Sequence, residues 1–319
     1  MSARRLLVDL GPLRRFPQFR LLWAGYLVRT FGNQLTIVAV PYQIFRLTGS
    51  SLDVGLASLV QIAPLLVGSF VGGLAADRYD RRRLLILTQV LLAGTSVGLA
   101  LNAESANPVV WPLFLCSALQ AGFSGVDNPA RTAMVVSVVD RDEIVRANAL
   151  WQVLFQFGQV GGPAVAGILL GSIGVAPVFW IDVASFGASL LSLLRMRPAQ
   201  IRPVAGADEV KRDFGLQAFL GGLRFLRRHQ VLQGVFLIDL NAMIFGMPRA
   251  LFPALGLDHF HGGATTVGLL YAAPGVGALV GALFTGWVAG VTRQGMAVLA
   301  AVTLWGVAIA LFGLVPWLS

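Results

Sequence analysis

The chain has 319 residues, of which 56% are hydrophobic and only 12% are charged, and its formal net charge at pH 7 is +9. A mean hydropathy of +0.75 excludes an ordinary soluble domain and predicts a protein whose residues mostly face apolar surroundings. The single cysteine, Cys116, excludes an internal disulfide and gives no support to a cysteine metal site.

Long apolar runs recur along the whole chain. A helix crosses a bilayer with ~20 mainly apolar residues, and none of the runs alternates as barrel strands do. We therefore predict an all-α membrane protein with nine spans. The spans cover residues 21–45, 53–76, 84–102, 109–131, 149–171, 175–195, 231–254, 265–289 and 296–317.

The basic residues are distributed unevenly between the two sides of these spans. If the N-terminus lies inside, 21 of the 24 Lys and Arg residues fall in cytoplasmic segments. The positive-inside rule therefore predicts a multi-pass protein with a cytoplasmic N-terminus. A charge spread over alternate loops also argues against nucleic acid as a partner.

The first and second spans carry polar groups at midplane depth. Arg29 is costly to insert into a bilayer, so it should be paired or face a water-filled pathway. Asn33, Gln34 and Gln61 can donate and accept hydrogen bonds without a fixed charge. We predict that Arg29 and these three amides line a substrate path, although each amide could instead form a structural hydrogen bond between helices.

The loop after the second span, residues 73–83, contains six charges in seven residues. A carboxylate at Asp77, where the span ends, could accept hydrogen bonds from a neighbouring helix N-terminus and hold the cytoplasmic side closed. The arginines could pair with Asp80, Asp127 or Asp140 in a network that rearranges during transport. A simpler alternative is a basic loop that only sets topology. The predicted gating residues are Gly73, Asp77, Arg78, Asp80, Arg81 and Arg82.

The fourth to sixth spans add an amide, two acids and a glycine-rich stretch. Gln120 joins the predicted substrate path, and Asp127 and Asp182 are candidates for carrying a proton. In the fifth span, small residues permit close packing and a proline removes a backbone donor, which favours a bend. Plain helix packing would leave the same pattern of small residues. The residues of this stretch are Gly158, Gly162, Pro163 and Gly167.

Residues 197–230 form a long polar connection whose second part is amphipathic. Its leucines follow helical spacing beside Arg224, Arg227 and Arg228, which predicts a helix on the inner leaflet. In the span that follows, Asp239 lies at about the depth of Arg29, so we predict that the two form an ion pair. Asp239 also belongs to the predicted substrate path and is a third candidate for carrying a proton.

Asn241 and Arg249 complete the predicted substrate path. Together with Arg29, Arg249 would give a central cavity a positive potential, which suits an anionic ligand better than a cationic one.

Several functional classes lack their required residues. The only lysine, Lys211, follows no glycine-rich turn, which excludes a P-loop and an ATP-driven pump within this chain. The sequence shows no Ser-His-Asp, Cys-His or HExxH arrangement, so we predict no enzyme, no metal and no cofactor. A secondary transporter, a receptor or a scaffold remains.

Two motifs carry a resemblance to a known family. The charged loop resembles G-x-x-x-D-R-x-G-R-[KR], with Asp80 in place of a glycine. The fifth span resembles the antiporter motif gxxxGPxxGG, with Ala166 at one glycine. On these motifs the chain resembles the major facilitator superfamily of transporters, and within it the drug and siderophore exporters of the enterobactin-exporter type.

The resemblance implies a six-helix N-terminal half at residues 1–196, a cytoplasmic connection with an amphipathic helix at 197–230, and a partial C-terminal half of three helices at 231–319. The family has six helices in each half, so three helices are expected to be absent and the chain to be truncated. The second copy of the charged motif is degenerate, with Gly290 at the position equivalent to Asp77.

The implied function is proton-coupled export of an enterobactin-like catecholate siderophore or a drug-like small molecule. Transport would cross the bacterial inner membrane by alternating access, in a monomer whose partners are the lipid bilayer, the substrate and a proton. The alternative is a truncated, transport-inactive membrane protein or scaffold that keeps the carrier fold.

Overall fold

The computed structural model describes residues 10–197, 216–283 and 293–314, and every regular element in these ranges is a helix. The described residues of eight of the nine predicted spans each fall on one helix to within two residues, and the ninth span, residues 231–254, falls on α9 and the short helical turns after it, which confirms the all-α prediction. The main helices are α1 (Gly11–Arg15), α2 (Pro17–Thr48), α3 (Ser51–Arg78), α4 (Arg81–Glu104), α5 (Trp111–Val138), α6 (Ile144–Ile173), α7 (Val175–Arg195), α8 (Leu216–Arg228), α9 (Gln230–Gly246), α11 (Gly263–Leu283) and α12 (Gln294–Leu314).

Seven helical stretches in the described part are long and apolar enough to cross a bilayer. α2 and α5 are not among them, although they have 32 and 28 residues and a span needs only ~20. Both helices carry buried charged side chains, including Arg29 and Asp127. These two helices therefore contribute charged side chains to the interior of the bundle.

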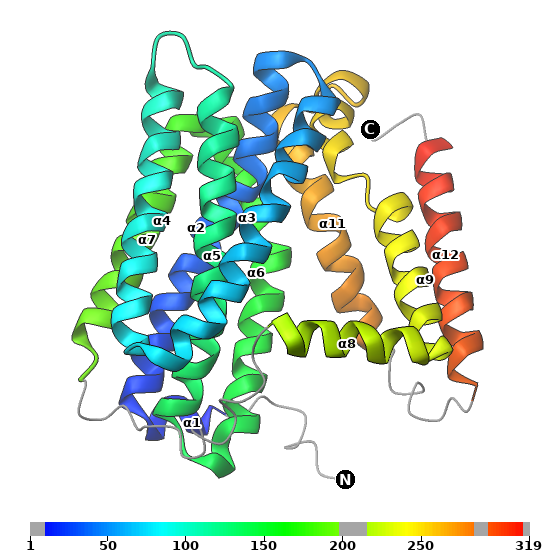
Figure 1. Cartoon of the computed structure of the whole chain (residues 1–319). Coiled ribbons are helices and arrows are strands. Elements are labelled where there is room, and N and C mark those ends of the chain that lie inside the picture. The colour runs from blue at the N-terminus through cyan, green and yellow to red at the C-terminus, as the bar shows by residue number, and fades with distance from the viewer. Residues whose placement is uncertain (1–9, 198–215, 284–292, 315–319) are drawn as a thin grey trace.

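The helices α2 to α7 form one bundle (Figure 1). α3 packs along α5, α2 packs against α6 and α7, and α4 packs against α5 and α7. α11 packs along α6, while α9 and α12 lie side by side farther from the bundle (Figure 1). α6 is therefore the main contact between the bundle and the helices that follow α8.

Two apolar clusters enclose a polar layer in the bundle. One cluster contains Phe19 and Leu22 from the start of α2, and the other contains Val38 and Ile44 from its second half. Between them, α2 buries Arg29, Thr30, Gln34 and Thr36. Buried polar groups need hydrogen-bond partners, so this layer fixes how α2 is oriented against its neighbours.

The predicted basic segments meet at one end of the bundle. Arg15 in α1 forms an ion pair with Glu143 at 3.0 Å, and the side chain of Arg82 donates to the backbone oxygen of Leu193 at 2.8 Å. The helix α8 runs crosswise to the other helices, from beside the bundle toward α9 and α12 (Figure 1). It lies within the segment predicted to be amphipathic, and Arg224, Arg227 and Arg228 are exposed.

The span predicted at residues 231–254 is not one continuous helix. α9 ends at Gly246 and is followed by the short helical turns η5 (Arg249–Leu251), α10 (Phe252–Ala254) and η6 (Leu255–His259). Met247, which precedes Pro248, adopts φ −124° and ψ 78°. A residue before proline is disfavoured in helical conformation, and this interrupts α9 one turn before Arg249.

Candidate functional site

A cavity of about 380 Å³ lies between α2, α3, α5, α11 and the turn η5. Its walls combine apolar side chains with amides and hydroxyls from helices far apart in sequence. The lining residues are Asn33, Thr36, Ile37, Val40, Pro41, Ile44, Val54, Ala57, Ser58, Gln61, Leu65, Ser117, Gln120, Ala121, Ser124, Arg249, Ala250 and Tyr271. Mostly apolar walls with a few convergent polar groups are typical of small-molecule sites.

Arg249 is the one charged side chain among these lining residues. Within the described part of the chain, its guanidinium forms no ion pair or hydrogen bond, and the cavity has no acidic side chain in its wall. A cation without a carboxylate partner gives the cavity a positive potential. This arrangement favours an anionic ligand.

The break after α9 and the side chain of Tyr271 hold Arg249 at the cavity. The Tyr271 hydroxyl donates to the backbone oxygen of Arg249 at 3.0 Å. Its ring meets Phe252 edge to face, with 5.1 Å between the ring centroids. Tyr271 belongs to α11, so the position of the cation depends on contacts between α11 and the interrupted segment.

The structure brings Asn33, Gln61, Gln120 and Arg249 together at this cavity and leaves the other predicted substrate residues outside it. Arg29 and Gln34 are buried within the bundle. Asp239 and Asn241 lie on the exposed surface of α9, where Asn241 borders a separate hollow against α12.

Sequence reasoning missed Ser117, Thr36 and Tyr271 as cavity residues. Ser117 lies three residues before Gln120 on α5, so helical periodicity places them on one face and could have revealed it. The Ser117 Oγ is buried without a hydrogen-bond partner. An unsatisfied hydroxyl at a cavity wall is available to a ligand.

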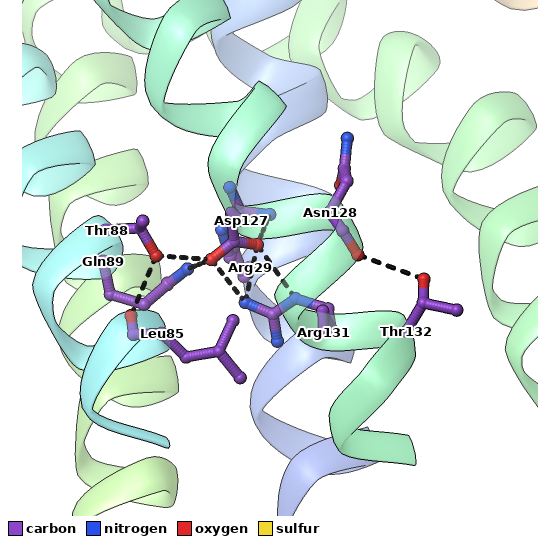
Figure 2. Close-up of polar contacts among 8 residues, drawn as sticks. All are labelled: Arg29, Leu85, Thr88, Gln89, Asp127, Asn128, Arg131 and Thr132. Carbon is purple, nitrogen blue, oxygen red and sulfur yellow. Dashed lines mark hydrogen bonds and ion pairs between the residues drawn. The ribbon is translucent and has the colours of Figure 1, made fainter. Parts of the chain in front are cut away.

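A buried ion cluster lies deeper in the bundle, between α2, α4 and α5 (Figure 2). The Arg131 Nε and Nη2 atoms lie 3.0 and 3.2 Å from the two Asp127 carboxylate oxygens. An Arg29 nitrogen lies 3.9 Å from Asp127 Oδ2, and Thr88 and Gln89 each donate to Oδ1 at 2.8 Å. Asp127 is thus compensated by two guanidinium groups and fully hydrogen-bonded.

The predicted pair of Arg29 with Asp239 is wrong for this structure, because the partner of Arg29 is Asp127. Equal depth in the membrane placed Arg29 and Asp239 together in the prediction. The depth of a residue in the membrane does not determine the direction in which its side chain points around the helix axis. In the structure α5 lies beside α2, whereas α9 lies apart from the bundle. The guanidinium of Arg29 also lies over the Phe186 ring, 5.2 Å from its centroid.

Asp182 is the centre of a second buried polar network. Its Oδ2 accepts hydrogen bonds from Thr36 and Ser96, both at 2.7 Å. Ser96 in turn accepts a hydrogen bond from the Gln120 amide at 3.0 Å. Thr36 and Gln120 both line the cavity, so Asp182 is connected to the cavity wall by two routes.

The arginine side chains of the charged loop, at Arg81 and Arg82, donate hydrogen bonds to hydroxyl and backbone oxygens rather than to carboxylates. Arg81 donates to Ser137 Oγ at 2.6 Å, and Arg82 donates to the backbone oxygens of Leu193 and Leu194. Asp80 caps α4 by accepting from the Arg83 backbone N–H. The predicted pairing of Arg81 and Arg82 with acids is therefore wrong in the described structure.

For two other predicted gating residues, Asp77 and Gly73, the described part of the structure shows no contact that supports or contradicts the prediction. The side chain of Asp77 lies outside the described residues. A Cβ placed on Gly73 would meet no atom of the described chain within 4 Å.

The glycine-rich stretch of α6 packs against two helices. A Cβ at Gly158 or Gly162 would overlap Thr30 or Gln34 of α2. On the α11 side, a Cβ at Gly167 would lie 2.7 Å from the Cα of Gly268. At Gly158 and Gly162 the space of a side chain is filled by α2 side chains, and at Gly167 it is filled by the α11 backbone, so α6 packs closely against both helices.

Comparisons with known proteins agree with this architecture. A family model described as "transmembrane secretion effector", of the major facilitator superfamily, matches residues 8–318. The enterobactin exporter EntS of Citrobacter koseri is 31% identical over 319 residues, covering 100% of this chain and 75% of the relative. EntS of Shigella boydii is 31% identical over 316 residues, covering 99% of this chain and 74% of the relative.

A solved structure shares the fold. It is a bacterial homologue of the human lysosomal transporter Spinster, in an inward-facing and unoccupied conformation, with a TM-score of 0.63 and 16% identity. The alignment covers 86% of this chain and 62% of that chain, so the present chain spans less than two thirds of the length of this structural relative.

Proposed function

Because the chain belongs to the transmembrane secretion effector family of major facilitator superfamily transporters, we propose that it is a proton-coupled exporter of anionic small molecules. The proposed substrates are catecholate siderophores and drug-like anions of similar chemistry, moved out of the bacterial cytoplasm by alternating access. The relatives named as enterobactin exporters support this class of substrate.

The observation that carries the proposal is Arg249, which has no ion-pair partner among the described residues and lies at a cavity without an acidic wall residue. A charge-assisted hydrogen bond from a guanidinium to a phenolate or carboxylate is stronger than a neutral one. The amides of Asn33 and Gln61 and the hydroxyl of Ser117 provide hydrogen bonds for the remaining oxygens of a catechol. A cationic drug would meet Arg249 with no carboxylate to compensate it.

The contacts of α6 support alternating access. Rocking of one helix group against another needs an interface that can slide without losing packed volume. At Gly167 and Gly268 the backbones of α6 and α11 meet without side chains between them, and in this proposal the two helices slide past each other at this contact. In this proposal, Arg81 and Arg82 fasten the end of α4 to α5 and α7 while the helix groups move.

The predicted orientation and division of the chain belong to the same proposal. The segments at residues 1–196, 197–230 and 231–319 act as the first helix group, the connection and the second group. The basic end of the bundle faces the cytoplasm, which follows from the positive-inside rule.

Transport in liposomes tests the proposal. The purified chain, reconstituted into liposomes with an acidic lumen, should accumulate dihydroxybenzoate, a single anionic catechol, above the level in protein-free liposomes. Passive movement of a weak acid would exclude it from an acidic lumen, so accumulation requires coupled transport. Absence of accumulation, or equal accumulation of the cation ethidium, would contradict the proposal.

The variant Arg249→Ala tests whether the cavity at Arg249 is the binding site for the anion. Removal of a charged hydrogen bond should weaken the apparent affinity for dihydroxybenzoate by about 10- to 100-fold. The matched control is Arg46→Ala, which removes an exposed arginine from the end of α2 that lies outside the cavity lining. Equal losses in both variants would show that total charge, and not the cavity, attracts the anion.

A further inference from the structure

We infer that Asp182 is the carboxyl group whose protonation couples the cavity to the proton gradient. This inference rests on the proposed function and selects one residue from the three acids predicted as candidates. It is carried by three observations: the partners of each acid, the hydrogen-bond routes from Asp182 to the cavity, and the charges around α7.

The hydrogen bonds of Asp182 suit both protonation states. Its side chain is buried, and the hydroxyls of Thr36 and Ser96 donate to Oδ2 at 2.7 Å. The Ser185 Oγ lies 3.4 Å from Oδ1. Hydroxyl groups both donate and accept hydrogen bonds, so they can rotate to accept a hydrogen bond from a carboxylic acid. The site therefore accommodates the charged and the neutral carboxyl without losing its partners.

The other two candidates lack this property. Asp127 also accepts from Thr88 and Gln89, but its charge is compensated by Arg131 and Arg29, whose guanidinium groups are donors only and cannot accept a hydrogen bond from a protonated acid. Protonation of Asp127 would also leave two buried cations uncompensated. Asp239 is exposed on α9 and forms no hydrogen bond or ion pair with a described residue.

Among the described residues, no cation forms an ion pair with Asp182. Arg29 of α2 interacts with Asp182 electrostatically, but its ion pair is with Asp127. The titratable groups of α4 lie at its ends, at Arg81 to Arg83 and at Glu104, and Glu104 accepts a hydrogen bond from Trp180. Arg146 of α6 and Arg195 of α7 lie at the basic end of the bundle.

The link to the cavity passes through Ser96. In the structure Ser96 Oγ accepts from the Gln120 amide and donates to Asp182. When a proton binds Asp182 Oδ2, the new O–H can donate to Ser96 Oγ only if the Ser96 hydroxyl first turns its own hydrogen away from Asp182. This rotation also redirects the Ser96 lone pair that accepts from the Gln120 amide, so it weakens that hydrogen bond and frees the amide for a ligand in the cavity. One proton is gained by the carboxylate from one side of the membrane and lost to the other.

Infrared spectroscopy of the reconstituted chain tests the titration without transport. Acidification should produce a protonated-carboxyl band that is lost in Asp182→Asn and retained in Asp239→Asn, the matched acid in another span. Dihydroxybenzoate should change this band in the wild-type chain. In Ser96→Ala the band should remain but no longer respond to the ligand. A band that survives Asp182→Asn overturns the inference.

Transport by Asp182→Asn separates this inference from the proposed function. A one-unit pH difference supports about a tenfold concentration ratio for one proton per substrate, and this ratio should be lost in the variant. Exchange of internal for external dihydroxybenzoate should continue, which also shows that the variant is folded. If the wild type and the variant both accumulate the probe, the inference alone fails. If the wild type neither accumulates nor exchanges it, the proposed function fails, and the infrared band still decides the assignment of Asp182.

Discussion

The ion cluster at Asp127 and the cavity at Arg249 use the same side chain in opposite ways. In the cluster, Arg29 and Arg131 are buried against one carboxylate, and every oxygen of Asp127 has a donor. At the cavity, Arg249 has no acidic partner in the described chain, and neighbouring Ser117 has an unsatisfied hydroxyl. A compensated charge stabilises the fold, whereas an uncompensated charge next to empty space can bind a ligand.

The largest expected effect comes from breaking the cluster. Asp127→Ala should lower the free energy of unfolding by about 3–5 kcal/mol, because it leaves two buried guanidinium groups without a counter-charge. The midpoint of denaturant unfolding in detergent, followed by tryptophan fluorescence, measures this. Arg249→Ala is the comparison and should stay within about 0.5 kcal/mol of the wild type, because Arg249 is exposed and forms no ion pair. Equal stability of the two variants would show that the cluster is not a structural element.

A smaller effect on stability is expected at the interface between α6 and α11, which connects the bundle to the helix that carries Tyr271. In Gly167→Ala the new Cβ would lie 2.7 Å from the Cα of Gly268, so α6 and α11 must separate. We expect about 1–3 kcal/mol of destabilisation from overpacking, together with reduced accumulation in liposomes.

The matched control for this interface is Gly277→Ala in α11, where a Cβ meets no described atom within 4 Å. Alanine has a higher helix propensity than glycine, so this variant should have unchanged stability or be more stable by up to ~1 kcal/mol. A neutral result at Gly167 would contradict the close packing of α6 and α11.

The smallest effect concerns the support of the cavity cation. Tyr271→Phe removes the hydrogen bond to the backbone of Arg249 but keeps the ring contact with Phe252. The loss of about 0.5–1.5 kcal/mol should raise the dissociation constant for dihydroxybenzoate by about 2- to 10-fold. Tyr42→Phe is the matched tyrosine, because Tyr42 is buried on α2 but does not line the cavity. Equal binding by wild type and Tyr271→Phe would show that the turn positions Arg249 without this bond.

The helices were predictable because each span is encoded locally. A run of apolar residues must satisfy its backbone hydrogen bonds internally in a bilayer, and a helix does this without reference to the rest of the chain. The predicted spans therefore fall on the helices of the structure. The exception is α9, where the effect of Pro248 on Met247 is also local and could have been recognised.

The pairing of polar residues was less predictable. Asn33, Gln61, Gln120 and Arg249 were selected as polar residues within spans, and the structure places them around one cavity. Arg29 and Asp239 were selected by the same criterion, but one is buried against Asp127 and the other is exposed on α9. Composition and depth identify which residues are costly to place in lipid, and they do not identify partners on other helices.

The sequence by itself determined the membrane-spanning helices and the presence of buried charges, because hydropathy, helix length and the cost of inserting an ion are properties of short segments. Only the tertiary structure decided which charges compensate one another. Ion pairs and hydrogen bonds act over a few ångströms, so the roles of Asp127, Asp182 and Arg249 depend on the rotation and contacts of helices that are distant in sequence.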